Sequence, residues 1–372
     1  MDAKRLVPEY IQALDAYPPG KPIEELEREY GVRDSIKIAS NENPLGPSPR
    51  ALAALEQALR QLHRYPDGAC YYLRRALARK LGLSSEAFIV GNGSNEVIEL
   101  IVRTFLRAGD EAVMADQAFA IYRLVVQAHG GRSRQVPLRN FTHDLDAIAD
   151  AIGPGTRLVF LANPNNPTGT IFFREQWEEF LASLRDDVVV VMDEAYAEFV
   201  EDARYPDSIA ALSGRQPLIV LRTFSKIYGL AGLRIGYGIS QPELIDMMNR
   251  VRAPFNTNSL AQAAALAALD DDAHVERTRQ INREGLSYLR AQMERLGLPV
   301  VPSWANFLLV RVGDAGRVYE TLLRRGVIVR PMGFYGFPDY VRVTVGLPAE
   351  NERFVRTLEE ILAPEGGRGR IV

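Results

Sequence analysis

Five polar side chains with complementary chemistry follow three short apolar runs of the 372-residue chain. Asn166 comes after the first run, Asp193 and Tyr196 after the second, and Lys226 and Arg234 after the third. A lysine amine can act as a nucleophile or a base, a carboxylate can stabilise a nearby cation, and a guanidinium can bind an anion. Each residue alone is as well explained by a turn, a helix cap or a solvated loop. Their shared position after three such runs indicates one site.

The apolar runs are typical of strands that are buried on both faces of a sheet. Several are unbroken stretches of hydrophobic residues without inside–outside alternation. Amphipathic helical segments lie between them, and this alternation predicts a mainly parallel α/β sheet. Ligands bind beyond the carboxyl ends of the strands in such sheets, so the five side chains should converge on one crevice. The runs are Phe88–Val90, Glu111–Ala115, Leu158–Ala162, Val188–Met192, Leu218–Leu221 and Ile235–Ile239, and the helical segments are residues 95–106, 119–129 and 175–184.

The pattern changes after Pro254, where a second unit begins. A long helical region is expected over residues 259–296, followed by short apolar runs and further helices, which predicts a smaller α+β unit. The irregular, Pro-rich N-terminal segment is expected to pack with this unit. The predicted large domain therefore spans residues 50–257, and the predicted small domain combines residues 1–49 with 258–372.

The composition excludes several classes of protein. Lys and Arg total 44 against 47 Asp and Glu, a net charge of −3 without a basic stripe, so no nucleic-acid partner is expected. No apolar run approaches the ~20 residues that cross a membrane. One cysteine, Cys70, and four scattered histidines predict no metal site. The first residues lack a hydrophobic signal segment, which predicts a cytoplasmic protein.

The motifs around the five side chains resemble a known family. They are Asn163-Pro-Asn-Asn-Pro-Thr-Gly169, Asp193-Glu-Ala-Tyr196, Thr223-Phe-Ser-Lys226 and Gly229-Leu-Ala-Gly-Leu-Arg-Ile-Gly236. Over essentially its whole length, the chain resembles the class I/II aminotransferases of fold type I, which depend on pyridoxal 5′-phosphate (PLP). The resemblance implies a large PLP-binding domain with a mainly parallel central sheet flanked by helices, and a smaller α+β domain.

Further segments resemble one branch of this family, the histidinol-phosphate aminotransferases. They are Tyr17-Pro-Pro-Gly-Lys-Pro-Ile-Glu-Glu-Leu26, Arg64-Tyr-Pro-Asp67, Val329-Arg-Pro-Met332 and Arg342-Val-Thr-Val-Gly346. This resemblance implies the reversible, ping-pong conversion of imidazole-acetol phosphate and L-glutamate to L-histidinol phosphate and 2-oxoglutarate, a step of histidine biosynthesis.

The resemblance also assigns roles around the cofactor. Lys226 joins PLP covalently and is the catalytic base. Asp193 faces the ring nitrogen, where a carboxylate favours the protonated form. Tyr196 and Asn166 face the ring oxygen O3′, and Phe119 stacks on the ring. The phosphate is expected at a helix start and three further residues, namely Gly93, Ser94, Asn95, Thr223, Ser225 and Arg234. Related enzymes often carry Asp in place of Asn95, so a side-chain contact from this residue stays open.

The remaining roles concern the substrate and a second subunit. Arg330, Arg342 and Tyr17 are expected to hold the substrate phosphate or the carboxylates of glutamate. Tyr65 is expected to reach the cofactor phosphate of the partner subunit, which implies a homodimer with two shared active sites.

Three alternatives share part of this pattern. An aromatic-amino-acid aminotransferase would carry nearly every motif, and a PLP-dependent decarboxylase of a phosphorylated amino acid is also similar. A PLP-sensing regulator would need an N-terminal DNA-binding domain, and no helix-turn-helix pattern precedes the main domain. A dinucleotide oxidoreductase is excluded because no strand leads into a Gly-x-Gly-x-x-Gly turn.

Overall fold

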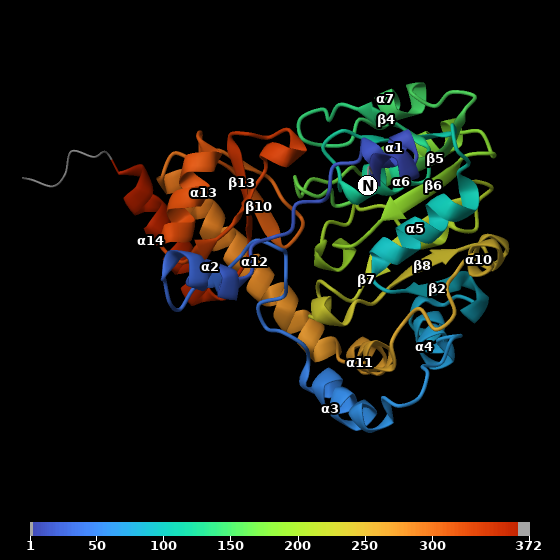
Figure 1. Ribbon diagram of the computed structural model, residues 1–372, viewed down its shortest axis with the longest axis horizontal. Coiled ribbons are helices and arrows are strands. Elements are labelled where there is room, and N and C mark those ends of the chain that lie inside the picture. The colour runs from blue at the N-terminus through green and yellow to red at the C-terminus, as the bar shows by residue number, and fades with distance from the viewer. Residues whose placement is uncertain (1–2, 364–372) are drawn as a thin grey trace, which may run out of the picture.

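A seven-stranded sheet covered by helices on both faces forms the larger part of the computed structural model, which describes residues 3–363 (Figure 1). The strand order is β2-β8-β7-β6-β5-β3-β4, and only β8 runs antiparallel to its neighbours. The predicted mainly parallel α/β sheet is therefore confirmed. The strands are β2 (Phe88–Gly91), β3 (Glu111–Ala115), β4 (Arg132–Val136), β5 (Thr156–Ala162), β6 (Val189–Asp193), β7 (Leu218–Thr223) and β8 (Gly236–Ser240).

Alternate residues of the central strands enter two separate hydrophobic cores. In β6, Val190 and Met192 pack on one side of the sheet and Val191 on the other. Because both faces are covered, the strands are apolar without alternation, as the sequence indicated. One face carries α5 (Ser94–Phe105), α6 (Ile121–Ala128) and α10 (Pro242–Asn249), and the other carries α3 (Pro49–Ala58), α4 (Tyr71–Leu81), α7 (Leu145–Asp150), α8 (Arg174–Ser183) and α11 (Ser259–Leu269).

Strand β4 was not anticipated from the sequence. It forms one edge of the sheet, and its residues Arg132, Ser133, Arg134 and Gln135 are polar and largely solvent-facing. Charged side chains on an edge strand oppose pairing with another chain, which explains why the strand lacks a hydrophobic signature.

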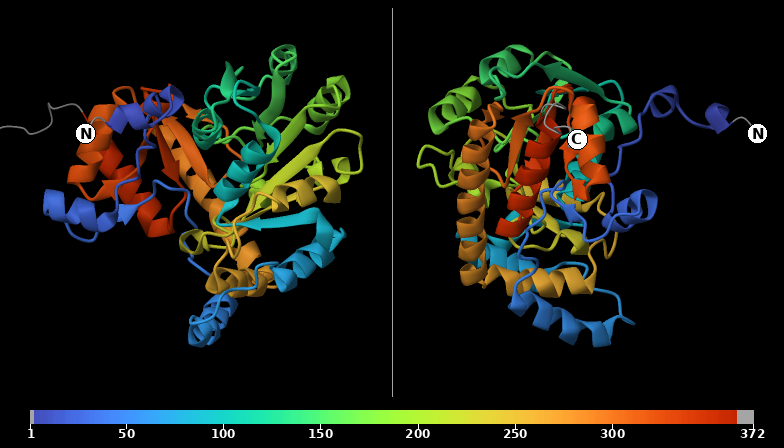
Figure 2. Two further views of the ribbon diagram at one scale, coloured as in Figure 1. Left: turned by 45° about the vertical axis from the view of Figure 1, so that its right-hand side comes forward. Right: turned by 90° about the vertical axis from the view of Figure 1, so that its left-hand side faces the viewer.

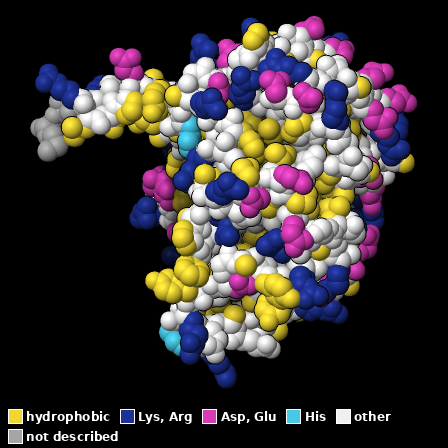
Figure 3. Space-filling view, turned by 90° about the vertical axis from the view of Figure 1, so that its right-hand side faces the viewer, with side chains coloured by type: hydrophobic (Ala, Val, Ile, Leu, Met, Phe, Trp, Pro, Cys, Tyr) yellow, Lys and Arg dark blue, Asp and Glu magenta, His cyan; other side chains and the backbone are white. Residues whose placement is uncertain are grey.

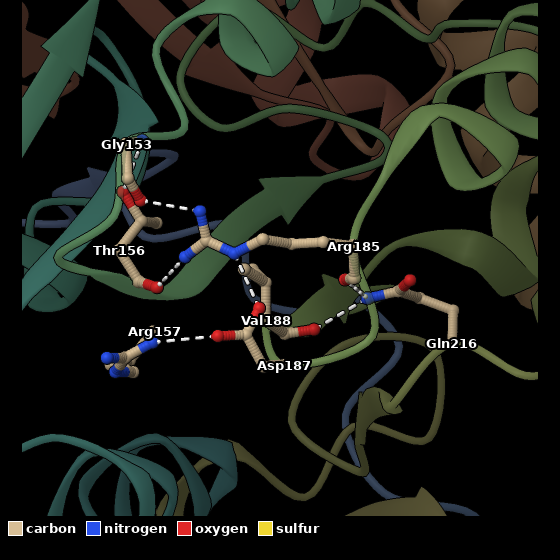
Figure 4. Close-up of polar contacts among 7 residues, drawn as sticks. All are labelled: Gly153, Thr156, Arg157, Arg185, Asp187, Val188 and Gln216. Carbon is tan, nitrogen blue, oxygen red and sulfur yellow. Dashed lines mark hydrogen bonds and ion pairs between the residues drawn. The ribbon is translucent and has the colours of Figure 1, made fainter.

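A polar network ties the amino ends of β5, β6 and β7, at the edge of the sheet opposite the carboxyl ends (Figure 4). The guanidinium of Arg185 donates to the carbonyl oxygens of Gly153 and Thr156, each at 2.8 Å, and also pairs with Asp187. Gln216 Nε2 donates to the carbonyl oxygen of Val188 at 2.6 Å. These bonds fix the register at which the three strands begin, and hence where their carboxyl ends lie.

The smaller unit is built on a four-stranded antiparallel sheet of order β12-β13-β10-β9. The long α12 crosses from the large unit along this sheet (Figure 2), and α13 and α14 complete a third core with it. The elements are α12 (Asp272–Arg295), β9 (Val300–Val301), β10 (Phe307–Arg311), α13 (Ala315–Arg324), β11 (Val327–Ile328), β12 (Arg330–Pro331), β13 (Tyr340–Thr344) and α14 (Pro348–Leu362), with α9 (Ser208–Ala211) in the large unit.

The N-terminal segment contacts both units. Gln127 of α6 donates to the carbonyl oxygen of Tyr10, which places α1 (Glu9–Gln12) against the large unit. Further on, α2 (Ile23–Tyr30) reaches the small unit, where Tyr30 donates to Glu320, and β1 (Ile36–Lys37) pairs in parallel with β11. The division into residues 50–257 against 1–49 and 258–372 stays a prediction.

The long helical region expected over residues 259–296 consists of two helices, α11 and α12. Asp271 separates α11 from α12, and its carboxylate caps α12 by accepting from the backbone N–H of His274. Asp is a favoured N-cap because its side chain satisfies a helix N–H that has no partner within the helix. Among the described residues, no helix is long and apolar enough to cross a membrane.

Candidate active site

A cavity of about 390 Å³ opens at the carboxyl ends of β5, β6 and β7. Ten residues singled out in the sequence line it together. They are Ser94, Asn95, Phe119, Asn166, Asp193, Tyr196, Thr223, Ser225, Lys226 and Arg234. Parallel strands bring these residues together because each ends at the same edge of the sheet.

Asp193 is the last residue of β6, and its carboxylate is buried. Tyr122 Oη donates to one carboxylate oxygen at 2.6 Å, and the backbone N–H of Ala195 donates to the other at 3.1 Å. Burial raises the pKa of Asp193, while these two hydrogen bonds lower it. A cationic group bound in the cavity beside Asp193 would offset the free-energy cost of burying the negative charge of this carboxylate.

Lys226 lies across the cavity in the loop after β7. Its amine donates to the carbonyl oxygen of Ser40 at 3.2 Å and lies 5.6 Å from the centre of the Tyr196 ring. Burial lowers the pKa of Lys226 to about 8, and the charge of Arg342 acts in the same direction. About a tenth of the amine is therefore neutral at pH 7, far more than at the ordinary lysine pKa of 10.5, and the neutral form is the one that acts as nucleophile or base.

Tyr196 and Asn166 both present hydrogen-bond donors to the cavity. Asn41 Nδ2 donates to Tyr196 Oη at 2.8 Å, so the phenol proton of Tyr196 is free for another acceptor. The amide oxygen of Asn166 accepts from Arg342, which leaves the amide nitrogen to donate. This arrangement suits an anionic ring oxygen, the role that the sequence assigned to these two residues.

An anion-binding corner forms where α5 begins. Ser94 and Asn95 are its first residues, so their backbone N–H groups lack partners within the helix. Gly93 adopts φ = 76°, and a Cβ there would lie 2.6 Å from Arg234 Nη2, so only glycine lets the arginine lie against this loop. Arg234 uses Nη1 to bond Ala231. Gly236 likewise lets β8 lie directly against the start of α5, because a Cβ at this position would lie 2.4 Å from the Ser94 nitrogen.

The cavity is not lined by the predicted substrate-binding residues Arg342, Arg330 and Tyr17, although Arg342 contacts its wall through Asn166. Arg342 is buried, and Nη1 bonds Asn166 while Nη2 donates to Ala39 O at 2.8 Å. Its Nε is buried without a hydrogen bond among the described residues. Arg330 donates to the carbonyl oxygens of Pro18 and Pro19, and its guanidinium lies 5.7 Å from the centre of the Tyr17 ring.

Tyr65 is not part of this cavity. Its side chain is 83% exposed and stacks on Phe255, with ring centres 4.9 Å apart. The structure contains one chain, so the contact expected with a second subunit stays a prediction.

Four residues near the cavity were missed in the sequence. Tyr122 packs its ring edge-on against Phe119, with ring centres 5.6 Å apart, but Phe119 precedes α6 and no helical periodicity marks the Tyr122 hydroxyl as part of the site. Ser40, Asn41 and Glu42 belong to an irregular segment, and no periodicity in the sequence indicates that they reach the site.

The family model for aminotransferase class I and II matches residues 33–358. The chain therefore belongs to the class I and II aminotransferases. It is 53% identical to the histidinol-phosphate aminotransferase of Moorella thermoacetica over 357 residues, which cover 95% of this chain and 92% of that protein. This similarity places the chain in the histidinol-phosphate aminotransferase branch of the class.

Solved structures show the same relationship. The histidinol-phosphate aminotransferase of Sinorhizobium meliloti, in complex with PLP, matches with a TM-score of 0.87 at 31% identity, covering 95% of this chain and 96% of that one. L-threonine-O-3-phosphate decarboxylase of Porphyromonas gingivalis has a TM-score of 0.78 at 26% identity, over 88% of this chain and all of that one (100%). The fold is thus shared with one of the alternative activities.

The cavity residues fit PLP. A buried carboxylate suits a protonated ring nitrogen, two free donors suit a ring oxygen, and a helix start with Arg234 suits a phosphate. Lys226 supplies a partly neutral amine for the aldehyde. Each group of the cofactor thus has a chemically complementary partner among the residues at the cavity.

The pKa of Lys226 predicts how fast the apoenzyme takes up PLP covalently. The neutral amine is the nucleophile, so the rate should rise roughly tenfold per pH unit below the pKa and level off above a midpoint of about 8. Stopped-flow absorbance of apoenzyme mixed with PLP measures this, and borohydride reduction with peptide mapping identifies the lysine. Lys226→Ala is the control, which should bind PLP without being fixed by borohydride. A midpoint near the ordinary lysine value of 10.5 would contradict the prediction.

Removing the charge of Asp193 should slow turnover. Asp193→Asn keeps the shape of the side chain and abolishes the anion, so kcat should fall by at least ~10²-fold, as for other charge-stabilising groups. Steady-state kinetics with saturating PLP measures the effect. Asp246→Asn, which removes an exposed carboxylate paired with Arg250, is the matched control and should match the parent. Parent-like turnover by Asp193→Asn would remove this residue from the mechanism.

Proposed function

We propose that this protein is a PLP-dependent aminotransferase that interconverts histidinol phosphate and imidazole-acetol phosphate, with glutamate and 2-oxoglutarate as the second pair. The observation that carries the proposal is the position of Arg342. Its buried guanidinium contacts Asn166 at the cavity wall, and Arg330 and Tyr17 lie near enough to Arg342 to interact with it electrostatically. Two guanidinium groups can bind a phosphate ester or the two carboxylates of glutamate.

The proposed reaction divides the work between cofactor and chain. PLP, when bound, supplies an electron sink for the bond that breaks at the substrate α-carbon. Lys226 Nζ would act as the base that carries the proton between the substrate α-carbon and C4′ of the cofactor. Asp193 holds the positive charge of the ring nitrogen, and Tyr196 and Asn166 donate to the ring oxygen. Arg342 and Arg330 orient the substrate so that its α-carbon faces Lys226.

The substrate comparison tests this function against its competitors. Histidinol phosphate, phenylalanine and aspartate are offered as amine donors to 2-oxoglutarate, and L-threonine-O-3-phosphate is offered in parallel with carbon dioxide release followed. The proposal requires the highest kcat/KM on histidinol phosphate. Highest activity on phenylalanine would support an aromatic aminotransferase, and carbon dioxide release from a phosphorylated amino acid would support a decarboxylase.

We also propose that the enzyme is a homodimer in which Tyr65 serves the partner's site. Exposed hydrophobic side chains support this, because a monomer gains nothing by leaving several large aromatic groups in water. Figure 3 shows hydrophobic patches on one face of the molecule. Some of them lie in its lower part, at the height of α3 and α4 in Figure 1. The exposed residues of this region are Leu52, Leu59, Leu62, Tyr65, Tyr71, Tyr72 and Phe255. A cytoplasmic location is part of the proposal and rests on the sequence alone.

Arg330 should decide between phosphorylated and carboxylic substrates. Removing one charged partner from a desolvated anion costs about 2–5 kcal/mol, so Arg330→Ala should lower kcat/KM for histidinol phosphate by at least ~100-fold. Phenylalanine should lose much less, because Arg342 alone can bind its single carboxylate. Steady-state kinetics on both substrates provides the ratio. Equal losses on the two substrates would contradict a phosphate-specific role.

Subunit mixing should show whether Tyr65 acts across the dimer. A mixed dimer of Tyr65→Phe and Lys226→Ala subunits contains one site with an intact lysine. If Tyr65 acts in trans, that site receives Tyr65 from the Lys226→Ala subunit and should bind PLP with parent affinity. Fluorescence titration of PLP into mixed apoenzyme measures this, with parent and Lys226→Ala mixtures as the control. Absence of any parent-like site would contradict the trans arrangement.

A further inference from the structure

The segment from Ser40 to Asn43 is held rigidly beside Lys226 by buried asparagines. The Asn41 side chain donates to Tyr196 and accepts from Thr344 Oγ1 at 3.0 Å. Asn43 Nδ2 donates to the carbonyl oxygen of Ile227 at 2.8 Å. Glu42 lies between these two anchored residues, so its main chain is fixed from both sides.

Glu42 lines the cavity, and one oxygen of its carboxylate accepts no hydrogen bond from the described residues. Glu42 lines the cavity together with Ser40, and its side chain is 43% exposed. Its Oε1 accepts from Lys37 Nζ at 2.9 Å, and Oε2 has no hydrogen bond within residues 3–363. The negative charge of Glu42 lies close enough to Lys226 to raise the pKa of the lysine, whereas burial lowers that pKa.

The other cavity residues leave one part of the substrate without a partner. Asp193 and Glu42 are the only carboxylates that line the cavity in the described chain, and Asp193 faces the cofactor. Histidinol phosphate carries an amine, a phosphate and an imidazole ring on separate arms. The amine must reach the cofactor beside Lys226, and the arginines of the small unit suit the phosphate. The ring N–H still needs an acceptor, since an N–H that loses its water on binding and finds no acceptor costs free energy.

We propose that Glu42 binds the imidazole ring of the substrate through Oε2 and thereby selects imidazole over phenyl and phenol rings. The inference rests on the proposed function and deepens it, because it assigns a residue to the side-chain specificity of the same site. A carboxylate binds a ring N–H more strongly than a neutral acceptor does and also favours the protonated ring. A site built to bond a substrate N–H discriminates strongly against an analogue that lacks it.

The test compares two phosphorylated amines that differ only in the ring. Histidinol phosphate and phenylalaninol phosphate share the amine and phosphate, so every other contact of the site is common to both. Glu42→Gln should lower kcat/KM for histidinol phosphate by roughly 10- to 100-fold, the loss expected for one charged hydrogen bond, and change that for phenylalaninol phosphate by less than about threefold. Calorimetric binding of histidinol phosphate to the pyridoxamine 5′-phosphate form should weaken by a similar factor.

Two control variants separate ring binding from structural roles. Lys37→Gln removes the ion-pair partner and keeps the carboxylate, so it should retain the preference for histidinol phosphate. Glu201→Gln removes a glutamate that pairs with Arg283 on the surface, and it should match the parent on both amines. Loss of the preference in Lys37→Gln, to the extent seen in Glu42→Gln, would overturn the inference by assigning Glu42 a structural role.

The remaining outcomes distinguish this inference from the proposed function. Equal losses of Glu42→Gln on both amines, or no loss on either, would overturn the ring-binding role while leaving the proposed function in place. A parent enzyme that is inactive on both phosphorylated amines and active on phenylalanine would overturn the proposed function and the inference with it.

Discussion

The carboxylate of Asp193 is buried at the end of β6, where a charge persists only if it is hydrogen-bonded or paired. Tyr122 and the backbone of Ala195 supply two hydrogen bonds, and these still leave burial as the dominant influence on its pKa. The cavity beside it therefore favours a cation. This requirement explains the surrounding arrangement, because the strands that bury Asp193 also bring Asn166 and Lys226 to the same edge.

The site is shared between the two units of the chain. The large unit provides the groups proposed to face the ring and phosphate of the cofactor, and the small unit provides the arginines proposed to bind the substrate. Arg342 connects the two, because one side of its guanidinium contacts Asn166 and another contacts Ala39. In the proposed site, Arg342 would therefore connect the substrate anion with Asn166, the residue expected to donate to the ring oxygen of the cofactor.

The sequence was sufficient for the central sheet and for the residues at its strand ends. Unbroken apolar runs predict buried parallel strands, and the position of Asp193 or Lys226 follows from where a run ends. Strand β4 escaped this reasoning because an edge strand is polar, and its pairing with β3 depends on tertiary contact alone. The break at Asp271 was missed because a capping aspartate looks like any polar residue inside a long helical pattern.

The site itself was predicted in part, for a physical reason. Strand-end residues are positioned by local sequence and sheet topology, whereas Glu42 is positioned through its neighbours Asn41 and Asn43, which bond residues 303 and 184 positions away. Tyr122 resembled a core aromatic because it is one, with its ring stacked on Phe160 and only its hydroxyl directed to Asp193. A hydroxyl on a buried ring carries no periodic signal in the sequence.

The pairing of β1 with β11 has a consequence for how the protein is made. Asn41 at the cavity bonds Thr344, so the wall beside Lys226 joins residues separated by 303 positions. A nascent chain that has emerged only to the end of α11 already contains Lys226 and Asp193 but has neither arginine of the small unit nor the strand that holds the N-terminal segment in place. Because domains generally fold as they leave the ribosome, the large sheet can form first, and the N-terminal segment must wait for its partner. The active site is therefore among the last parts of the molecule to be completed during synthesis.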